Sequence, residues 1–347
     1  MELLLVKLPE FPQWKQINDD VKLHLISNTL DYRTRCMLQL TSSEMKKIVD
    51  RCPLFVNNCQ LLWKSQNEGK WDVCVDDKNG VIETTEAVVA QFVKLFSHPK
   101  SLFDSLDIMT CDELHRESFV ADLTKLVDAL ESSKVVIRVS KMKWDWRSNT
   151  ASLFRRFLEM CDPVVLNNIA FAGESKDTTG FEKIADTPHW KKLKGLFCNG
   201  IIPPTEVISH MARISLRRRE IPEGYVQALL ESFTRRALPV GSFFRIYHRL
   251  PDSFMKIVES FPAIPKDAGG SFAKQCDLMA KQNMRKHQDT ILGLCVPSSD
   301  LLLVVKLCPY NTRAVVCRKE HMLSDFKIPC LLFDHTPVDD RDILHLI

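Results

Sequence analysis

The sequence predicts an α+β protein in which a small three-helix unit precedes a curved α/β stack and a closing β cap. Three short amphipathic helical patterns follow one another within residues 14–51. Strand-like apolar runs then alternate with longer helical patterns, at intervals of about thirty residues in the early part of the stack. The C-terminal part returns to paired strand-like runs. These patterns together favour a small helical module joined to a larger α/β module.

Composition indicates an ordinary globular protein. The chain has 347 residues, of which 45% are hydrophobic and 26% charged, enough for one large domain and a small one. A net charge of +3 gives no argument for bulk binding to nucleic acid or to a membrane surface. The twelve cysteines form no CxxC pair, and no signal peptide or apolar run of about eighteen residues is visible. We therefore expect reduced thiols and a cytoplasmic or nuclear location.

The helical unit has recognisable start and stop signals. Asn18 or Asp19 caps a first helix, and Asp31 caps a second over residues 32–40. Residues 41–44, Thr-Ser-Ser-Glu, form a capping-box pattern that opens a third helix. Its apolar face carries Met45, Ile48 and Val49, and Cys52-Pro53 ends it. A unit of about forty residues buries too little apolar surface to be stable alone, so part of its apolar surface must meet the rest of the chain or another protein.

Several short motifs in this unit resemble an F-box of the A type expanded in nematodes, which is often joined to an FTH domain. They are Trp14, Val21-Lys22, residues 30–36 (Leu-Asp-Tyr-Arg-Thr-Arg-Cys) and residues 40–42 (Leu-Thr-Ser). The Leu-Pro pair that usually opens an F-box is replaced by Ile17-Asn18. The resemblance implies docking onto the Skp-type adaptor of a cullin-RING ubiquitin ligase, through the first two helices. The side chains implied in this contact are Trp14, Ile17, Val21, Leu25, Leu30, Cys36 and Leu40.

Beyond this unit, strands and helices alternate. Residues 59–64 and 71–75 predict a hairpin around a polar turn. The repeat spacing that follows lies in the range of leucine-rich-type repeats, without their regular Leu or Asn positions. The predicted strands are 102–108, 135–140, 166–171, 193–198 and 213–216. The predicted helices are 83–96, 117–131, 151–160, 179–185 and 223–236.

A second resemblance lies inside this stack. Residues 158–169, followed by His189-Trp190-Lys191-Lys192-Leu193-Lys194, resemble the FTH domain, with His189 where the family usually has Gln. The resemblance covers roughly residues 100–300 and implies that this region binds the substrate. Trp190 itself is predicted to be a packed core residue rather than a platform for a ligand.

A mildly basic strip is the candidate substrate face. If the strands alternate with apolar residues inward, Arg138 faces outward, as do Arg213, Ser215 and Arg217. The run Arg217-Arg218-Arg219 has two interpretations. It is either a solvated strand end or a site for phosphate on a modified substrate.

The C-terminal region predicts strands at 243–247, 300–307 and 313–317, with a turn at 308–312. Residues 266–270 predict a flexible point and residues 275–288 a polar helix. The predicted domains are an F-box at 12–56, a joining hairpin and helix at 57–100, the FTH or leucine-rich-repeat-like domain at 101–300 and a β cap at 301–347.

The sequence favours a non-catalytic protein. It has no GxGxxG, HExxH or GxSxG motif and no metal-ligand spacing, so we expect no catalytic residue, metal or cofactor. The predicted function is a substrate-recognition adaptor of an SCF-type ubiquitin ligase, with a Skp-type adaptor, a cullin scaffold and an unknown protein substrate as partners. The alternative is a repeat-type interaction scaffold outside any ligase, whose degenerate F-box is only a helical cap turned inward.

Overall fold

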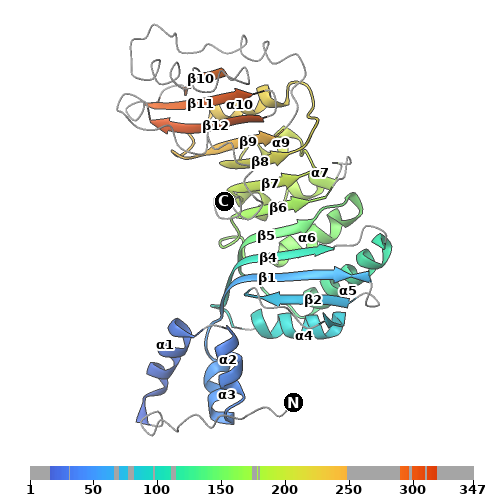
Figure 1. Cartoon of the computed structure of the whole chain (residues 1–347), viewed down its shortest axis with the longest axis vertical. Coiled ribbons are helices and arrows are strands. Elements are labelled where there is room, and N and C mark those ends of the chain that lie inside the picture. Colours follow the sequence, from blue (N-terminus) through green and yellow to red (C-terminus); the bar gives the residue numbers. More distant parts are fainter. Residues whose placement is uncertain are drawn as a thin grey trace, which may run out of the picture. The chain divides into compact units, whose positions relative to one another are not determined.

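The computed structural model describes residues 16–30, 32–65, 70–76, 82–96, 98–110, 115–173, 178, 180–247, 290–296, 299–308 and 311–318. The chain divides into two compact units, unit 1 from residues 1–107 and 111–140 and unit 2 from residues 108–110 and 141–347. Both combine helices with strands, which confirms the predicted mixed α/β character (Figure 1). The predictions for Trp14, for Asp31 and for residues 266–270 and 275–288 lie outside the described residues.

Unit 1 begins with the three helices that the sequence predicted. They are short, and their boundaries fall within two residues of the predicted ones. They are α1 (Asp19–Thr29), α2 (Tyr32–Gln39) and α3 (Ser43–Asp50).

The predicted hairpin follows and is confirmed. Its two strands pair antiparallel, with Trp63 opposite Trp71. Both indoles are fully buried, and each lies against Phe119, with ring centroids 5.8 and 6.1 Å apart. These aromatic contacts fix the hairpin onto the helix that carries Phe119. The elements are β1 (Phe55–Lys64), β2 (Lys70–Val75), β3 (Ile82–Glu83), α4 (Thr85–Phe96), β4 (Leu102–Thr110) and α5 (Arg116–Ser132).

Unit 2 is built on a sheet that changes direction. Its first five strands run parallel in sequence order, and three antiparallel strands then follow in the order β12, β11, β10. The parallel strands are β5 (Val139–Asp145), β6 (Asn168–Ala172), β7 (Gly195–Asn199), β8 (Arg213–Arg217) and β9 (Phe243–Tyr247). The antiparallel strands are β10 (Thr290–Cys295), β11 (Leu301–Cys308) and β12 (Asn311–Arg318), and β11 and β12 confirm the predicted C-terminal hairpin.

Helices pack on one face of this sheet. Phe171 of β6 contacts Phe154, Phe181 and Trp190, with ring centroids 5.0, 5.4 and 6.2 Å away. Trp190 is 1% exposed, which confirms that it is a core residue. The helices are η3 (Ser148–Thr150), α6 (Ala151–Met160), α7 (Gly180–Ala185), α8 (Pro188–Lys192), α9 (Thr205–Ile208) and α10 (Tyr225–Arg235).

Several elements differ from the prediction, among them the short β3 and η3, which were not predicted. Within the strand predicted at 135–140, only Ile137 and the last two residues pair with a neighbouring strand. Those last two residues are the start of β5. Helices α8 and α9 were not predicted, since four or five residues make little more than one helical turn and show no periodicity. Strand β10 was also missed, because the glycine Gly293 weakens its strand pattern.

Candidate docking surface of the helical unit

Two of the three N-terminal helices, α1 and α3, start at side-chain caps. The Asn18 side chain accepts a hydrogen bond from the Asp20 backbone N–H at 3.0 Å. At α3 the cap is Ser42, whose hydroxyl accepts from the Met45 N–H at 3.1 Å. The predicted capping box is therefore wrong by one residue. The Thr41 hydroxyl instead donates back to the Leu38 carbonyl at 2.7 Å.

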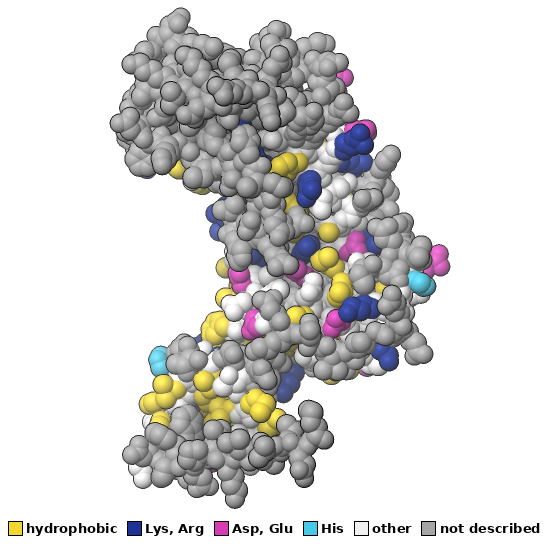
Figure 2. Space-filling model, viewed as in Figure 1, with side chains coloured by type: hydrophobic (Ala, Val, Ile, Leu, Met, Phe, Trp, Pro, Cys, Tyr) yellow, Lys and Arg dark blue, Asp and Glu magenta, His cyan; other side chains and the backbone are white. Residues whose placement is uncertain are grey.

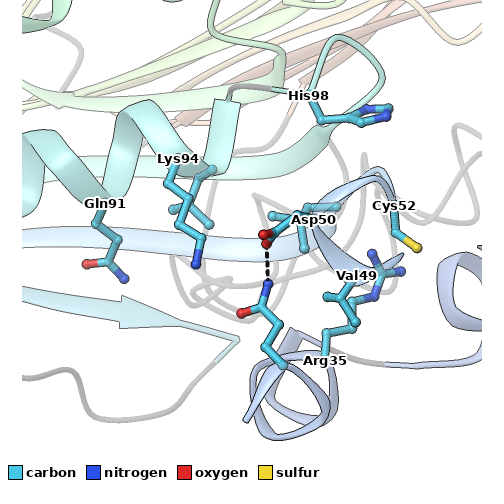
Figure 3. A pocket seen from close by; sticks show the side chains of 10 residues that line it. Arg35, Val49, Asp50, Cys52, Gln91, Lys94 and His98 are labelled. Atoms are coloured by element: carbon cyan, nitrogen blue, oxygen red, sulfur yellow. Dashed lines mark hydrogen bonds between the residues drawn. The ribbon is translucent and has the colours of Figure 1, made fainter. Parts of the chain in front are cut away.

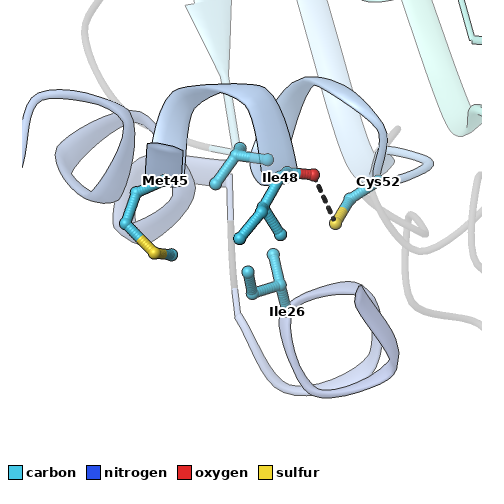
Figure 4. Close-up of a cluster of buried hydrophobic side chains, with 5 residues drawn as sticks. Ile26, Met45, Ile48 and Cys52 are labelled. Carbon is cyan, nitrogen blue, oxygen red and sulfur yellow. Dashed lines mark hydrogen bonds between the residues drawn. The ribbon is translucent and has the colours of Figure 1, made fainter. Parts of the chain in front are cut away.

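A small core of their own joins these helices. Five buried residues form it, and Leu30 packs against it together with two other partly buried leucines. The Cys52 thiol donates to the Ile48 carbonyl at 3.4 Å and so closes the end of α3 (Figure 4). Leu30 therefore stabilises the helical unit, independently of any role in binding. The core residues are Ile26, Met45, Ile48, Val49 and Cys52.

Two buried cations connect the helices to one another. Lys22 of α1 is 3% exposed and lies 3.2 Å from the Asp19 carboxylate and 3.6 Å from that of Glu44 on α3. Arg35 of α2 is also 3% exposed. Its guanidinium donates to three backbone carbonyls, those of Ser27 and Leu30 at the end of α1 and that of Pro53 after α3. Burial lowers the pKa of the Arg35 guanidinium from its ordinary value.

Replacing Arg35 with methionine should loosen the helical unit, because three carbonyls lose a charged donor while the side-chain volume is kept. We expect a loss of about 3 kcal/mol in the local stability of α1–α3. Hydrogen exchange of the full chain measures this, with faster exchange in these helices and unchanged exchange in α6. Arg51→Met, at an exposed position after α3, is the matched control. Equal protection in both variants would contradict the structural role of Arg35.

A pocket of about 310 Å³ lies between α2, α3 and α4 (Figure 3). Arg35, Asp50, Lys94 and His98 supply most of its polar lining. Arg35 is held by carbonyls, and Asp50 accepts from the Gln39 amide at 2.7 Å. Because Arg35 and Asp50 are already engaged within the fold, the pocket is a poor candidate for a ligand site.

Large apolar side chains gather on the outside of the helices. Eight such side chains are exposed among the described residues, and four of them lie on α1, on α2 and in the turn after α2. Figure 2 shows hydrophobic side chains over this unit, in the lower part of the view. Val21 and Leu25 lie one turn apart on α1. We call this set the helical apolar surface: Val21 (49% exposed), Leu25 (38%), Met37 (59%) and Leu40 (81%).

The structure separates the predicted adaptor contacts into groups. Val21, Leu25 and Leu40 belong to the helical apolar surface, whereas Leu30 packs on the core. Ile17 is half-buried just before α1. Trp14 and the side chain of Cys36 lie outside the described part of the chain. Met37 is not among the predicted adaptor contacts. Its position as an apolar residue between Arg33 and Leu40, in a helix with cationic side chains, was the signal that could have identified it.

The predicted substrate residues are also divided. Arg138 belongs to unit 1, where it donates to the Pro99 carbonyl. Arg213 and Arg217 are exposed in unit 2, as predicted. The prediction for Ser215 is wrong, because its side chain is only 2% exposed. Ser215 keeps the alternation of Arg213 and Arg217, and only its exposure was predicted wrongly, because Phe197 of β7 and Arg245 of β9 flank this small residue in register.

Burial makes four of the described cysteines poor nucleophiles. Burial raises the pKa of the Cys59 thiol to about 12 and that of Cys317 to about 11. The thiols of Cys161 and Cys198 are fully buried, and burial raises their pKa values further. Within the described ranges, no group of His, Cys, Asp or Glu side chains has the arrangement of a metal site. No helix in the described part of the chain has both the length and the hydropathy to cross a bilayer.

Comparison with known families identifies part of this architecture. Residues 121–243 match the FTH domain, and the matched region runs from within α5 to the first residue of β9. This confirms the resemblance recognised around Trp190. The chain matches no curated protein and no solved structure. The chain therefore contains an FTH domain at residues 121–243.

Proposed function

We propose that this protein is a substrate-recognition subunit of a cullin-RING ubiquitin ligase, and that its helical unit is an F-box that binds a Skp-type adaptor. The helical apolar surface is the observation that carries the proposal. The helices already have their own core, and Val21, Leu25, Met37 and Leu40 are not part of it. The folding of the helical unit therefore does not account for these exposed apolar side chains. Exposed large apolar side chains concentrated on a small unit are typical of a protein-binding site.

The FTH domain supports the same proposal, because its presence suggests an F-box-associated family. The F-box-like motifs lie upstream of it, in the order that the resemblance implies. In this proposal unit 2, a leucine-rich-repeat-like stack, holds a protein substrate in the cytosol or nucleus. No catalytic group is needed, since the gain in rate comes from the effective concentration of the substrate near the ubiquitin-transfer enzyme.

The alternative, an interaction scaffold with a helical cap, predicts that the same apolar residues are buried. A cap turns its apolar face inward, against the larger core. Leu40 is instead 81% exposed and Met37 59% exposed. These values favour the adaptor-binding function over the cap.

Co-expression of the full chain with a Skp-type adaptor tests the proposal. We expect the two proteins to elute together in gel filtration, as a complex that survives dilution to micromolar concentration. A chain that elutes alone, monodisperse and folded by circular dichroism, would overturn the proposal and favour the scaffold.

A further inference from the structure

The C-terminal strands of the unit 2 sheet direct cations to the face that lies opposite the helices. The described helices of unit 2 lie on one face (Figure 1), where Phe244 of β9 packs against Phe233 of α10 with ring centroids 5.1 Å apart. Side chains alternate along a strand, so Arg245 points to the opposite face. Arg313 of β12 is paired in register with Arg245, and Lys306 of β11 is paired with Arg313. The three cations therefore share that face.

Apolar side chains lie beside these cations. Val315 lies two residues beyond Arg313 on β12, and Val304 of β11 is paired with it. The runs 301–305 of β11 and 314–317 of β12 are wholly apolar, which is typical of strands that are covered on both faces. We call the following set the covered sheet face: Arg245, Leu302, Val304, Lys306, Arg313, Val315 and Cys317.

Every member of the covered sheet face is buried. Val304 is 0% exposed, Lys306 2% and Arg245 6%. The described helices of unit 2 lie on the other face, so they do not produce this burial (Figure 1). The burial is present in a single chain. Another part of the same chain therefore covers the face.

The cover has to supply negative charge as well as apolar groups. Burying a cation is costly unless it is paired, and Arg245, Arg313 and Lys306 take part in further interactions of the chain. The strands β8, β9, β12 and β11 contain no Asp or Glu. Carboxylates that neutralise the three cations therefore belong to the covering segment.

Two long segments of unit 2 lie outside the described residues, and their charges differ in sign. Residues 248–289 contain seven Lys or Arg and five Asp or Glu, a net charge of +2. Residues 319–347 contain three Lys or Arg and six Asp or Glu, a net charge of −3. Because the covered sheet face is cationic, charge complementarity selects residues 319–347.

The composition and the length of this segment also fit. Residues 339–347 read Asp-Asp-Arg-Asp-Ile-Leu-His-Leu-Ile, so acidic side chains directly precede an apolar run, just as cations lie beside valines on the face. The segment follows β12 directly, and its 29 residues can span about 95 Å when extended. Strand β8 lies only two strand spacings, about 10 Å, from β12.

We propose that residues 319–347 fold back over the covered sheet face. Their carboxylates pair with Arg245, Arg313 and Lys306, and their apolar side chains cover Val304 and Val315. This proposal does not depend on the proposed function of the chain. It reserves this end of the sheet for the chain's own segment, so unit 2 presents the face to another protein only when that segment leaves it.

Photo-crosslinking of the full chain tests the proposal. The probe is p-benzoylphenylalanine in place of Phe243, a half-buried residue of β9 that is paired in register with Val315. We expect irradiation to join this position to a peptide from residues 319–347, as identified by mass spectrometry of a tryptic digest. The same probe in place of Arg235, an exposed residue of α10, is the control and should not capture that segment. Capture of residues 248–289 from Phe243, or of no peptide, would overturn the proposal.

Charge variants test the pairing. Neutralising three acidic side chains of residues 319–347 should lower the crosslink yield from position 243 by at least about threefold, because the buried cations lose their partners. The control makes the same charge change in residues 248–289 and should leave the yield unchanged. Equal yields in the two triple variants would contradict the charge pairing and with it the proposal. The test variant is Asp339→Asn, Asp340→Asn and Asp342→Asn, and the control is Asp252→Asn, Asp267→Asn and Asp277→Asn.

The accessibility of Cys317 gives a second readout that needs no photoprobe. Its side chain is 5% exposed on the covered sheet face, whereas alternation places Cys198 of β7 on the helical face. We expect N-ethylmaleimide to alkylate Cys317 at least about tenfold faster in the test variant than in the native chain, with Cys198 unchanged. Faster alkylation of both thiols would show general unfolding, and an unchanged Cys317 would leave the face covered by another segment. Either result would reject the proposal.

Discussion

Leu25→Asp should abolish binding of the Skp-type adaptor while the chain stays folded. Leu25 is 38% exposed on the helical apolar surface, so an aspartate there remains hydrated in the free protein. In the complex the carboxylate would be buried without a partner, at a cost of about 3 kcal/mol or more, which is at least about a hundredfold in affinity. The measurement is titration of the purified chain with the adaptor by isothermal calorimetry.

Two further substitutions make this result specific. Leu40→Asp, at an 81% exposed position, should weaken the same complex with no loss of melting temperature. Val164→Asp makes a matched change at a 78% exposed valine of unit 2 and should bind the adaptor like the native chain. Adaptor affinity that is unchanged in both Leu25→Asp and Leu40→Asp would remove the helical apolar surface from the docking site.

Leu30→Asp is a less informative test of adaptor binding than the place of Leu30 among the predicted adaptor contacts suggests. Leu30 packs against the core of the helical unit, and its carbonyl accepts from Arg35 at 3.0 Å. A carboxylate there would unfold the helices, and loss of binding would then report folding. We expect this variant to show reduced hydrogen-exchange protection over α1–α3 even without the adaptor.

The largest stability effect is expected for Trp190→Ala. The Trp190 indole is 1% exposed, lies between Phe171 and Phe181 with both ring centroids 6.2 Å away, and donates to the Val207 carbonyl at 2.9 Å. Removing it leaves a cavity and an unpaired carbonyl, so we expect a loss of about 4 kcal/mol in the free energy of unfolding. Urea denaturation followed by circular dichroism measures this loss.

Trp190→Phe is the control for the ring alone. It keeps most of the packing and loses the N–H, so it should cost about 1 to 2 kcal/mol. If Trp190→Ala lowers the free energy of unfolding by less than about 1 kcal/mol, instead of the expected value of about 4 kcal/mol, the aromatic cluster does not hold unit 2 together.

Long periodic segments were predicted closely. Helix α6 matches its predicted range of 151–160, and β8 extends the predicted 213–216 by one residue. In α6 the apolar residues repeat with the helical period over several turns, so a single sequence specifies both the element and its buried face. The N-terminus of α3 was predicted one residue early, because Thr41, Ser42 and Ser43 can all cap a helix and only the tertiary structure selects among them.

The sequence by itself determined the three helices at the N-terminus, the longer strands and helices of the α/β stack and the FTH-like region, because these depend on local periodicity, caps and short motifs. Only the tertiary structure decided which apolar residues of the helices remain exposed and which, like Leu30, enter their core. It also buried Ser215 and joined Arg245, Arg313 and Lys306 in one row. That row depends on the register of strands far apart in the chain, and register is set by pairing between strands, which no local pattern contains.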